Sequence, residues 1–124
     1  MGNLRDKMAK SEVVFFRGSW IADYPDAESY LAMFYSKYPA PPNYTRFAND
    51  EFDALYEKAL GENDNAKRYE LYQQMDQIIM DNAPVVPLYY DEVVRLTKPY
   101  VKGLEGNAIN LLILKTVNFE RETK

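Results

Sequence analysis

The amino-acid sequence predicts a mixed α and β fold of about one domain, in which a helical block packs on a mixed sheet. Three observations support this. The chain has 124 residues and is 47% hydrophobic, as globular proteins are. One β-branched and aromatic run precedes residue 18, and similar regions follow residue 84. Apolar residues at helical spacing fill most of the sequence in between.

The first elements are a short helix and a strand. Residues 4–10 are typical of a short helix, because two apolar side chains lie four positions apart. Residues 12–17 contain the continuous apolar run Val13 to Phe16, which predicts a strand buried on both faces. A lone strand needs neighbours, so either the late strands pair with it or its neighbours lie outside this sequence.

Helix-capping residues mark the helices that follow. Asp26 is a good N-cap for a helix that reaches Phe34. The proline-rich residues 39–42 then predict an extended loop. Asn49 caps the next helix, and Gly61 fits the C′ position after its end.

The second half of the sequence predicts a helical hairpin and then strands. Asp64 caps a helix that Pro84 ends, and the short preceding turn predicts antiparallel packing against the helix before it. Three later regions are rich in β-branched and aromatic residues and predict strands, which are residues 85–90, 93–97 and 111–119.

Composition excludes several function classes. The net charge of −4 argues against nucleic-acid binding, which depends on Lys and Arg at phosphates. The sequence has no Cys and no His, so disulfides, thiolate catalysis, imidazole bases and the usual zinc sites are excluded. No cofactor and no metal are expected. No apolar run approaches the roughly 20 residues of a membrane span, and residues 1–10 lack the apolar centre of a signal peptide.

The segment from Arg17 to Asp26 holds the candidate ligand-binding residues. Asp23 can pair with a ligand cation, or its side chain can bond the backbone of its own turn. Trp20, the only indole, can stack on a ligand or anchor a core. Arg17 can bind a carboxylate, or it can be solvated or salt-bridged at the end of a strand.

Two other function classes stay open from the residues alone. One is a glycosidase that uses paired carboxylates, for which Asp23, Asp26 and Glu28 are the candidates. Close spacing in sequence does not place two carboxyl groups across a bond, and helix capping explains the last two. The other is a standalone helical interaction module that binds no small ligand.

Four blocks of the sequence resemble one known family. They are GSWIADYPD (18–26), YTRFANDEFDAL (44–55), DNAKRYELY (64–72) followed by DNAPVVPLY (81–89), and PYVKGLE (99–105). The blocks cover nearly the whole chain and occur in the family's order and spacing. The sequence resembles the carboxy-terminal part of extracytoplasmic solute-binding proteins of ABC transporters, in family 5, which includes dipeptide-, oligopeptide- and nickel-binding members.

The resemblance implies a fold in two lobes. Family members have the class II periplasmic-binding-protein fold, in which two α/β lobes close on a ligand between them. Residues 1–85 then correspond to an incomplete carboxy-terminal portion of the second lobe, and residues 86–124 to strands that return to the first lobe. Within this sequence they would form one compact unit. The early strand at residues 12–17 would find its sheet partners upstream.

The resemblance also implies a function without catalysis. Asp23 matches the position that pairs with the peptide's α-amino group, Trp20 an aromatic residue of a side-chain pocket, and Arg17 a basic residue directed at the peptide's carboxylate. The parent protein would capture short peptides in the periplasm, or at the cell surface as a lipoprotein, and deliver them to a membrane permease.

The same scaffold also binds oligosaccharides or nickel chelates in relatives, and these ligands stay open as alternatives. Without His, the sequence favours a peptide over a metal. Taken alone, the chain is expected to bind ligand poorly and to self-associate through exposed strand edges.

Overall fold

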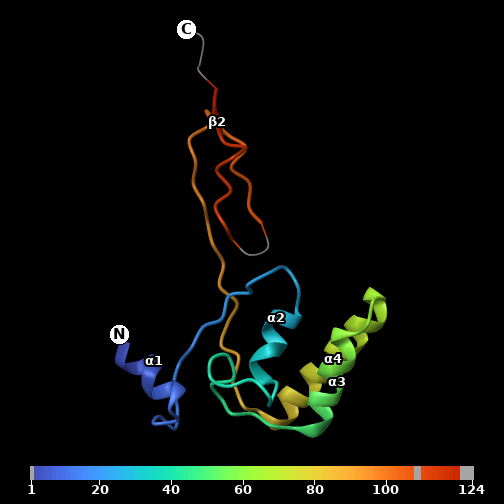
Figure 1. The fold of residues 1–124 in the computed structure, drawn as a ribbon. Coiled ribbons are helices and arrows are strands. Elements are labelled where there is room, and N and C mark those ends of the chain that lie inside the picture. Colours follow the sequence, from blue (N-terminus) through green and yellow to red (C-terminus); the bar gives the residue numbers. More distant parts are fainter. Residues whose placement is uncertain (1, 108–109, 121–124) are drawn as a thin grey trace. The chain divides into compact units, whose positions relative to one another are not determined.

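A computed structural model describes residues 2–107 and 110–120 of the chain. The chain divides into two units, Met1–Pro87 and Leu88–Lys124. The first unit is helical and the second contains a small sheet (Figure 1). The mixed α and β fold class is therefore confirmed, whereas the assignment of the chain to two lobes stays a prediction.

The chain begins with helix α1, Gly2–Ala9, close to its predicted place. The strand predicted at residues 12–17 does not form, because no described residue pairs with this segment in a ladder. Val14 and Phe15 are fully or almost fully exposed, at 106% and 90%. A strand becomes stable only when neighbours satisfy its backbone and cover its faces. The prediction of a buried strand is thus wrong for the structure described.

The helix predicted after Asp26 is short and tightens at its end. It comprises α2, Glu28–Leu31, followed by the 3-10 helix η1, Ala32–Phe34. The N-cap of α2 is Ala27, one position after the predicted Asp26. The Asp26 side chain still accepts a hydrogen bond from the Glu28 N–H at 2.9 Å, so it satisfies an N–H group of the first turn. Ser29 and Leu31 are buried, so this helix turns one polar and one apolar side chain inward.

Both predicted caps of the helical hairpin are confirmed. Helix α3, Asp50–Leu60, starts at Asn49, whose side chain accepts from the Phe52 N–H at 2.9 Å. Helix α4, Asn65–Asn82, starts at Asp64, which accepts from the Ala66 N–H at 2.9 Å. Each cap satisfies an N–H group that has no partner within its helix.

The ends of the two helices use different backbone conformations. The sequence predicts Gly61 at the C′ position beyond the end of α3, where glycine commonly adopts a positive φ. In the structure Gly61 is the C-cap residue of α3, and its φ is −92°. It therefore does not use glycine's conformational freedom. Ala83 instead ends α4 in the left-handed region, at φ 47°, just before Pro84.

The core of the first unit lies where α2, η1, α3 and α4 meet. Helices α3 and α4 pack side by side as the predicted hairpin (Figure 1). Phe52 and Met75 are completely buried, and Tyr56 is 1% exposed. The rest of the buried cluster comprises Leu31, Phe34, Tyr35, Ala59, Leu71, Tyr72 and Ile79. Burial of these side chains is the main stabilising contribution to the unit.

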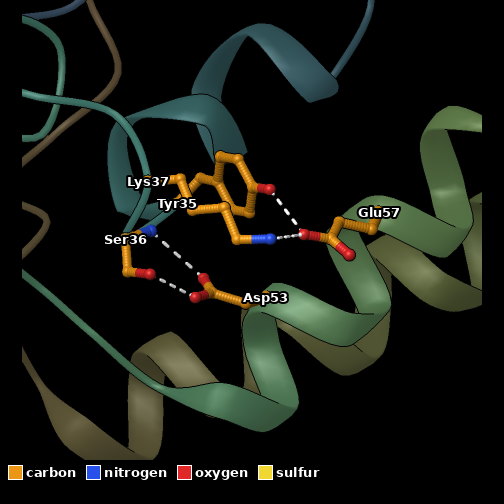
Figure 2. Close-up of polar contacts among 5 residues, drawn as sticks. All are labelled: Tyr35, Ser36, Lys37, Asp53 and Glu57. Atoms are coloured by element: carbon orange, nitrogen blue, oxygen red, sulfur yellow. Dashed lines mark hydrogen bonds and ion pairs between the residues drawn. The ribbon is translucent and has the colours of Figure 1, made fainter.

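Polar side-chain contacts join the segment after η1 to helix α3 (Figure 2). The Ser36 N–H donates to Asp53 Oδ1 at 3.1 Å, and the Tyr35 hydroxyl donates to Glu57 Oε1 at 2.6 Å. Lys37 Nζ also contacts Glu57 Oε1, and this hydrogen bond lowers the pKa of the Glu57 carboxyl. The Lys37–Glu57 pair is exposed, so it orients the segment more than it stabilises the fold.

The described part of the second unit contains a short antiparallel sheet. Strand β1, Val101–Lys102, pairs with strand β2, Asn118–Phe119, with Val101 opposite Phe119. Gly103 follows β1 at φ +73°, and an added Cβ would lie 2.2 Å from the Thr116 carbonyl oxygen. Only glycine fits there without moving the backbone.

The late strands are much shorter than predicted. Residues 85–90 and 93–97 form no ladder among the described residues, and only Asn118–Phe119 of the expected strand 111–119 is paired. Most side chains of these regions are exposed. Their β-branched and aromatic composition predicts strands, but a strand requires a pairing partner as well as propensity. Within the described part of the chain, no helix is long and apolar enough to cross a membrane.

Candidate functional site

Trp20 and Asp23 line the same pocket. This pocket is open to solvent and has a volume of about 270 Å³. Its other lining residues are Tyr24, Ser29, Ala32, Pro41 and Pro42. The wall is therefore mainly apolar and aromatic, with one carboxylate, which is the usual composition of a small-ligand site.

Ser29 connects the two predicted site residues. Its hydroxyl accepts a hydrogen bond from the Asp23 N–H at 2.9 Å, and its carbonyl oxygen accepts one from the Trp20 indole N–H at 2.9 Å. The Trp20 ring is half-buried, and its polar atom is satisfied. Trp20 thus contributes packing and presents part of its ring to the pocket.

The Asp23 carboxylate is exposed and takes part in no hydrogen bond or ion pair with the described residues. The interpretation of Asp23 as a turn residue whose side chain bonds its own backbone is therefore not what the structure shows. Its backbone N–H is bound instead, which leaves both carboxylate oxygens available to a ligand.

Arg17 does not line this pocket. It is exposed, and it lies in the segment before Gly18 that was expected to be a strand. The structure therefore brings together two of the three predicted site residues. A role for Arg17 toward a ligand carboxylate stays a prediction.

The sequence offers Asp26 as a helix cap and as one of three candidate glycosidase carboxylates, but in the structure Asp26 also links two helices. Its Oδ2 pairs with Arg68 Nη2 of α4 at 2.8 Å, and its Oδ1 accepts from the Tyr72 hydroxyl at 2.9 Å. Arg68 and Tyr72 are separated by four positions and lie on one face of α4. The sequence shows this spacing of Arg68 and Tyr72. It gives no sign that both contact Asp26, which lies 42 and 46 positions before them.

Tyr72, which donates to Asp26, has a raised pKa that an experiment can test. Burial, and then its hydrogen bond to Asp26, raises its pKa from the ordinary value of 10.0 to about 12. Because the pKa of the folded state is the higher one, the stabilisation is complete below pH 10. It is lost as the pH rises toward 12.

We expect the free energy of unfolding of the wild-type chain to fall between pH 10 and 12 more steeply than that of a Tyr72→Phe variant. Urea unfolding followed by circular dichroism over this range measures both slopes. Tyr30→Phe, at a tyrosine that is 45% exposed, serves as the control and should keep the wild-type slope. An unchanged slope in Tyr72→Phe would contradict the assignment.

A second open pocket, of about 410 Å³, is lined by Ala9 of α1 and by residues of the segment between η1 and α3. Asn43, which is 2% exposed, organises that segment by donating to the Tyr35 and Phe47 carbonyl oxygens. Arg46 points its guanidinium to the carbonyl oxygens of Ala9 and Asn43. These side chains are engaged in structural hydrogen bonds. In the described ranges, no group of three metal-ligating side chains occurs.

Comparisons with known proteins give relatives of one kind. No protein-family model matches the chain. The chain is 38% identical over 98 residues to the probable deoxycholate-binding periplasmic protein YgiS of Escherichia coli, which covers 79% of this chain and 18% of that protein. It is 32% identical over 101 residues to the dipeptide-binding protein DppE of Bacillus subtilis, covering 82% of this chain and 18% of that protein.

A further relative and a solved structure agree with these matches. The periplasmic oligopeptide-binding protein OppA of Escherichia coli is 32% identical over 90 residues, which is 73% of this chain and 16% of that protein. The chain thus spans less than a fifth of the length of these curated relatives.

The structure is similar to that of the unliganded, open form of the periplasmic murein tripeptide-binding protein MppA. The TM-score is 0.76 and the identity 27%, over 95% of this chain and 23% of that protein. Sequence and fold therefore agree on the same relatives, over most of this chain. The chain belongs to family 5 of the extracytoplasmic solute-binding proteins of ABC transporters.

Proposed function

We propose that the protein carrying this chain is the substrate-binding component of an ABC importer, and that it captures short peptides outside the cytoplasmic membrane. The chain contributes one wall of the binding site. The observation that supports this proposal most directly is the pocket that Trp20 and Asp23 both line, in which the Asp23 carboxylate has no hydrogen-bond or ion-pair partner among the described residues.

The chemistry of this wall suits the amino end of a peptide. A carboxylate favours an ammonium group, and a hydrogen bond between two charged groups is stronger than one between neutral groups. The apolar lining from Ala32, Pro41 and Pro42 can take an uncharged side chain next to that ammonium. Arg17 is proposed as a contact for the peptide carboxylate.

Binding without catalysis follows from how the carboxylates are used. A glycosidase needs two carboxyl groups available on either side of the scissile bond. Asp26, the nearest candidate in sequence to Asp23, is engaged with Arg68 and Tyr72. Glu28, the third candidate, accepts a hydrogen bond from the Tyr56 hydroxyl. Both other candidate carboxylates thus have partners among the described residues, which supports a binding role for Asp23.

The names of two relatives support peptides as the ligand class, and the name of a third gives deoxycholate as the main alternative ligand. DppE and OppA are named for dipeptides and oligopeptides, and YgiS for deoxycholate. Deoxycholate is an anion, and an unpaired Asp23 carboxylate would repel it. A peptide ammonium gains from the same charge.

Location and partners follow from the proposed role. The protein would act in the periplasm or on the cell surface, where it would meet the membrane permease of its transporter. Residues 1–85 and 86–124 would belong to the second and the first lobe respectively, and the two lobes would close on the peptide.

We expect Asp23→Asn to weaken the binding of a peptide with a free amino end by about tenfold to a hundredfold. The substitution keeps the shape and removes the charge. Isothermal titration of the natural protein that carries this sequence, with di- and tripeptides, measures the loss. N-acetylation of the peptide should weaken binding to the wild type by a similar factor.

Asp76→Asn is the matched control, since Asp76 is an exposed carboxylate in the middle of α4. It should leave peptide affinity unchanged. Equal affinity of Asp23→Asn and the wild type would refute the residue assignment. Binding of deoxycholate, with no binding of any peptide, would refute peptides as the ligand class.

A further inference from the structure

We propose that Ser29 is a positioning residue, which fixes the Asp23 backbone and the Trp20 ring so that both face one ligand. This inference rests on the proposed function, because it assigns Ser29 a task at the same pocket. Ser29 itself need not touch the peptide.

Ser29 is well placed for this task because it is held rigidly and used twice. It is only 2% exposed. Its hydroxyl accepts from the Asp23 N–H, and its carbonyl oxygen accepts from the Trp20 indole, both at 2.9 Å. Asp23 and Trp20 thus converge on one residue six and nine positions away.

Asp23 depends on this contact because it lies outside regular secondary structure. Residues 20–25 form no helix or strand. Among the described residues, the hydrogen bond to the Ser29 hydroxyl is the only one that holds Asp23. Removing the hydroxyl would leave the Asp23 N–H without its protein partner and free the backbone to rotate.

Ser29 is in turn anchored to the helical hairpin through Asp26. The Ser29 N–H donates to the Asp26 carbonyl oxygen at 3.2 Å, and the Asp26 carboxylate binds Arg68 and Tyr72 of α4. A continuous series of contacts therefore runs from the core helix α4 to the pocket wall. The wall is fixed by the core, although its own backbone is irregular.

The first measurement needs no ligand. Amide hydrogen exchange by NMR compares the wild-type chain with Ser29→Ala and Ser29→Thr. We expect the Asp23 N–H to exchange about tenfold or more faster in Ser29→Ala, and the Thr hydroxyl to restore its protection. Amides of α3, such as those of Tyr56 and Ala59, should keep their wild-type rates.

Trp20 gives a second signal in the same spectra. It is the only Trp of the chain, so the indole N–H gives a single resonance. We expect this resonance to stay near its wild-type position in Ser29→Ala, because the indole N–H donates to the Ser29 backbone carbonyl, which the substitution keeps. An unchanged Asp23 rate in Ser29→Ala would overturn the proposal. So would equal acceleration at every amide, because that result means general destabilisation.

The second measurement connects Ser29 to the ligand. In the natural protein that carries the chain, Ser29→Ala should weaken the binding of a peptide with a free amino end by about threefold to tenfold. The effect should disappear with the N-acetylated peptide and in the Asp23→Asn background, because Ser29 acts through Asp23. An undiminished effect in that background would overturn the proposal.

The two measurements separate the proposals. If the wild type binds no peptide, the proposed function fails, and the exchange rates still decide whether Ser29 positions Asp23. If peptide binds but the exchange of Asp23 does not depend on the Ser29 hydroxyl, only the positioning role fails.

Discussion

Phe52→Ala is expected to destabilise the first unit by about 3–5 kcal/mol. Phe52 is completely buried, and its ring lies 6.4 Å from that of Phe34 and 6.3 Å from that of Tyr56. Truncation removes the buried ring and leaves a cavity that the surrounding aromatic side chains can fill only in part. Small domains are stable by roughly 5–15 kcal/mol, so a large fraction of the stability would be lost.

Urea unfolding followed by far-ultraviolet circular dichroism measures this change. Leu60→Ala on the same helix is the control, because Leu60 is 59% exposed. It should change the free energy of unfolding by less than about 0.5 kcal/mol. Equal effects of the two substitutions would mean that α3 does not bury the face described.

Asp26→Ala is expected to cost about 2–4 kcal/mol of folding stability. The side chains of Asp26 and Arg68 are only 22% and 28% exposed, so water cannot fully replace the lost partner. The substitution also deprives the Tyr72 hydroxyl of its acceptor and the Glu28 N–H of its cap. One substitution thus removes two hydrogen bonds that join the start of α2 to α4, and one local hydrogen bond at the first turn of α2.

Asp26→Asn separates these contributions, because an amide oxygen can still accept hydrogen bonds while the charge is lost. We expect Asp26→Asn to lower the free energy of unfolding, but by less than Asp26→Ala does. Asp76→Ala, an exposed site on α4, should stay within about 0.5 kcal/mol of the wild type. A change of less than 0.5 kcal/mol in Asp26→Ala would contradict a role of this cluster in holding α2 on α4.

The helical part of the fold was predictable because its signals are local. Asn49 and Asp64 each cap a helix whose first free N–H groups lie two or three positions away. The apolar residues of α3 and α4 that recur at the helical period are mostly buried, although Leu60 at the end of α3 is 59% exposed. In both cases the decisive contacts lie within a few positions or along one helix face.

The strands were not predictable in the same way. Val13–Phe16 has strong β propensity, but its structure is decided by whether another segment pairs with it. Among the described residues of the second unit, only those of β1 and β2 meet in register. Composition gives the tendency to be extended, whereas pairing depends on partners distant in the sequence.

The sequence by itself determined the family, the helical hairpin and the likeness of Trp20 and Asp23 to ligand-binding positions. Tertiary structure alone decided that these two side chains line one pocket without Arg17, and that Ser29 and Asp26 connect the pocket wall to α4. The physical reason is the separation along the sequence of the groups that interact. Caps and helix periodicity act over a few residues, whereas the hydrogen bonds of Asp26 join groups 42 and 46 positions apart. Such contacts form only after the chain has folded.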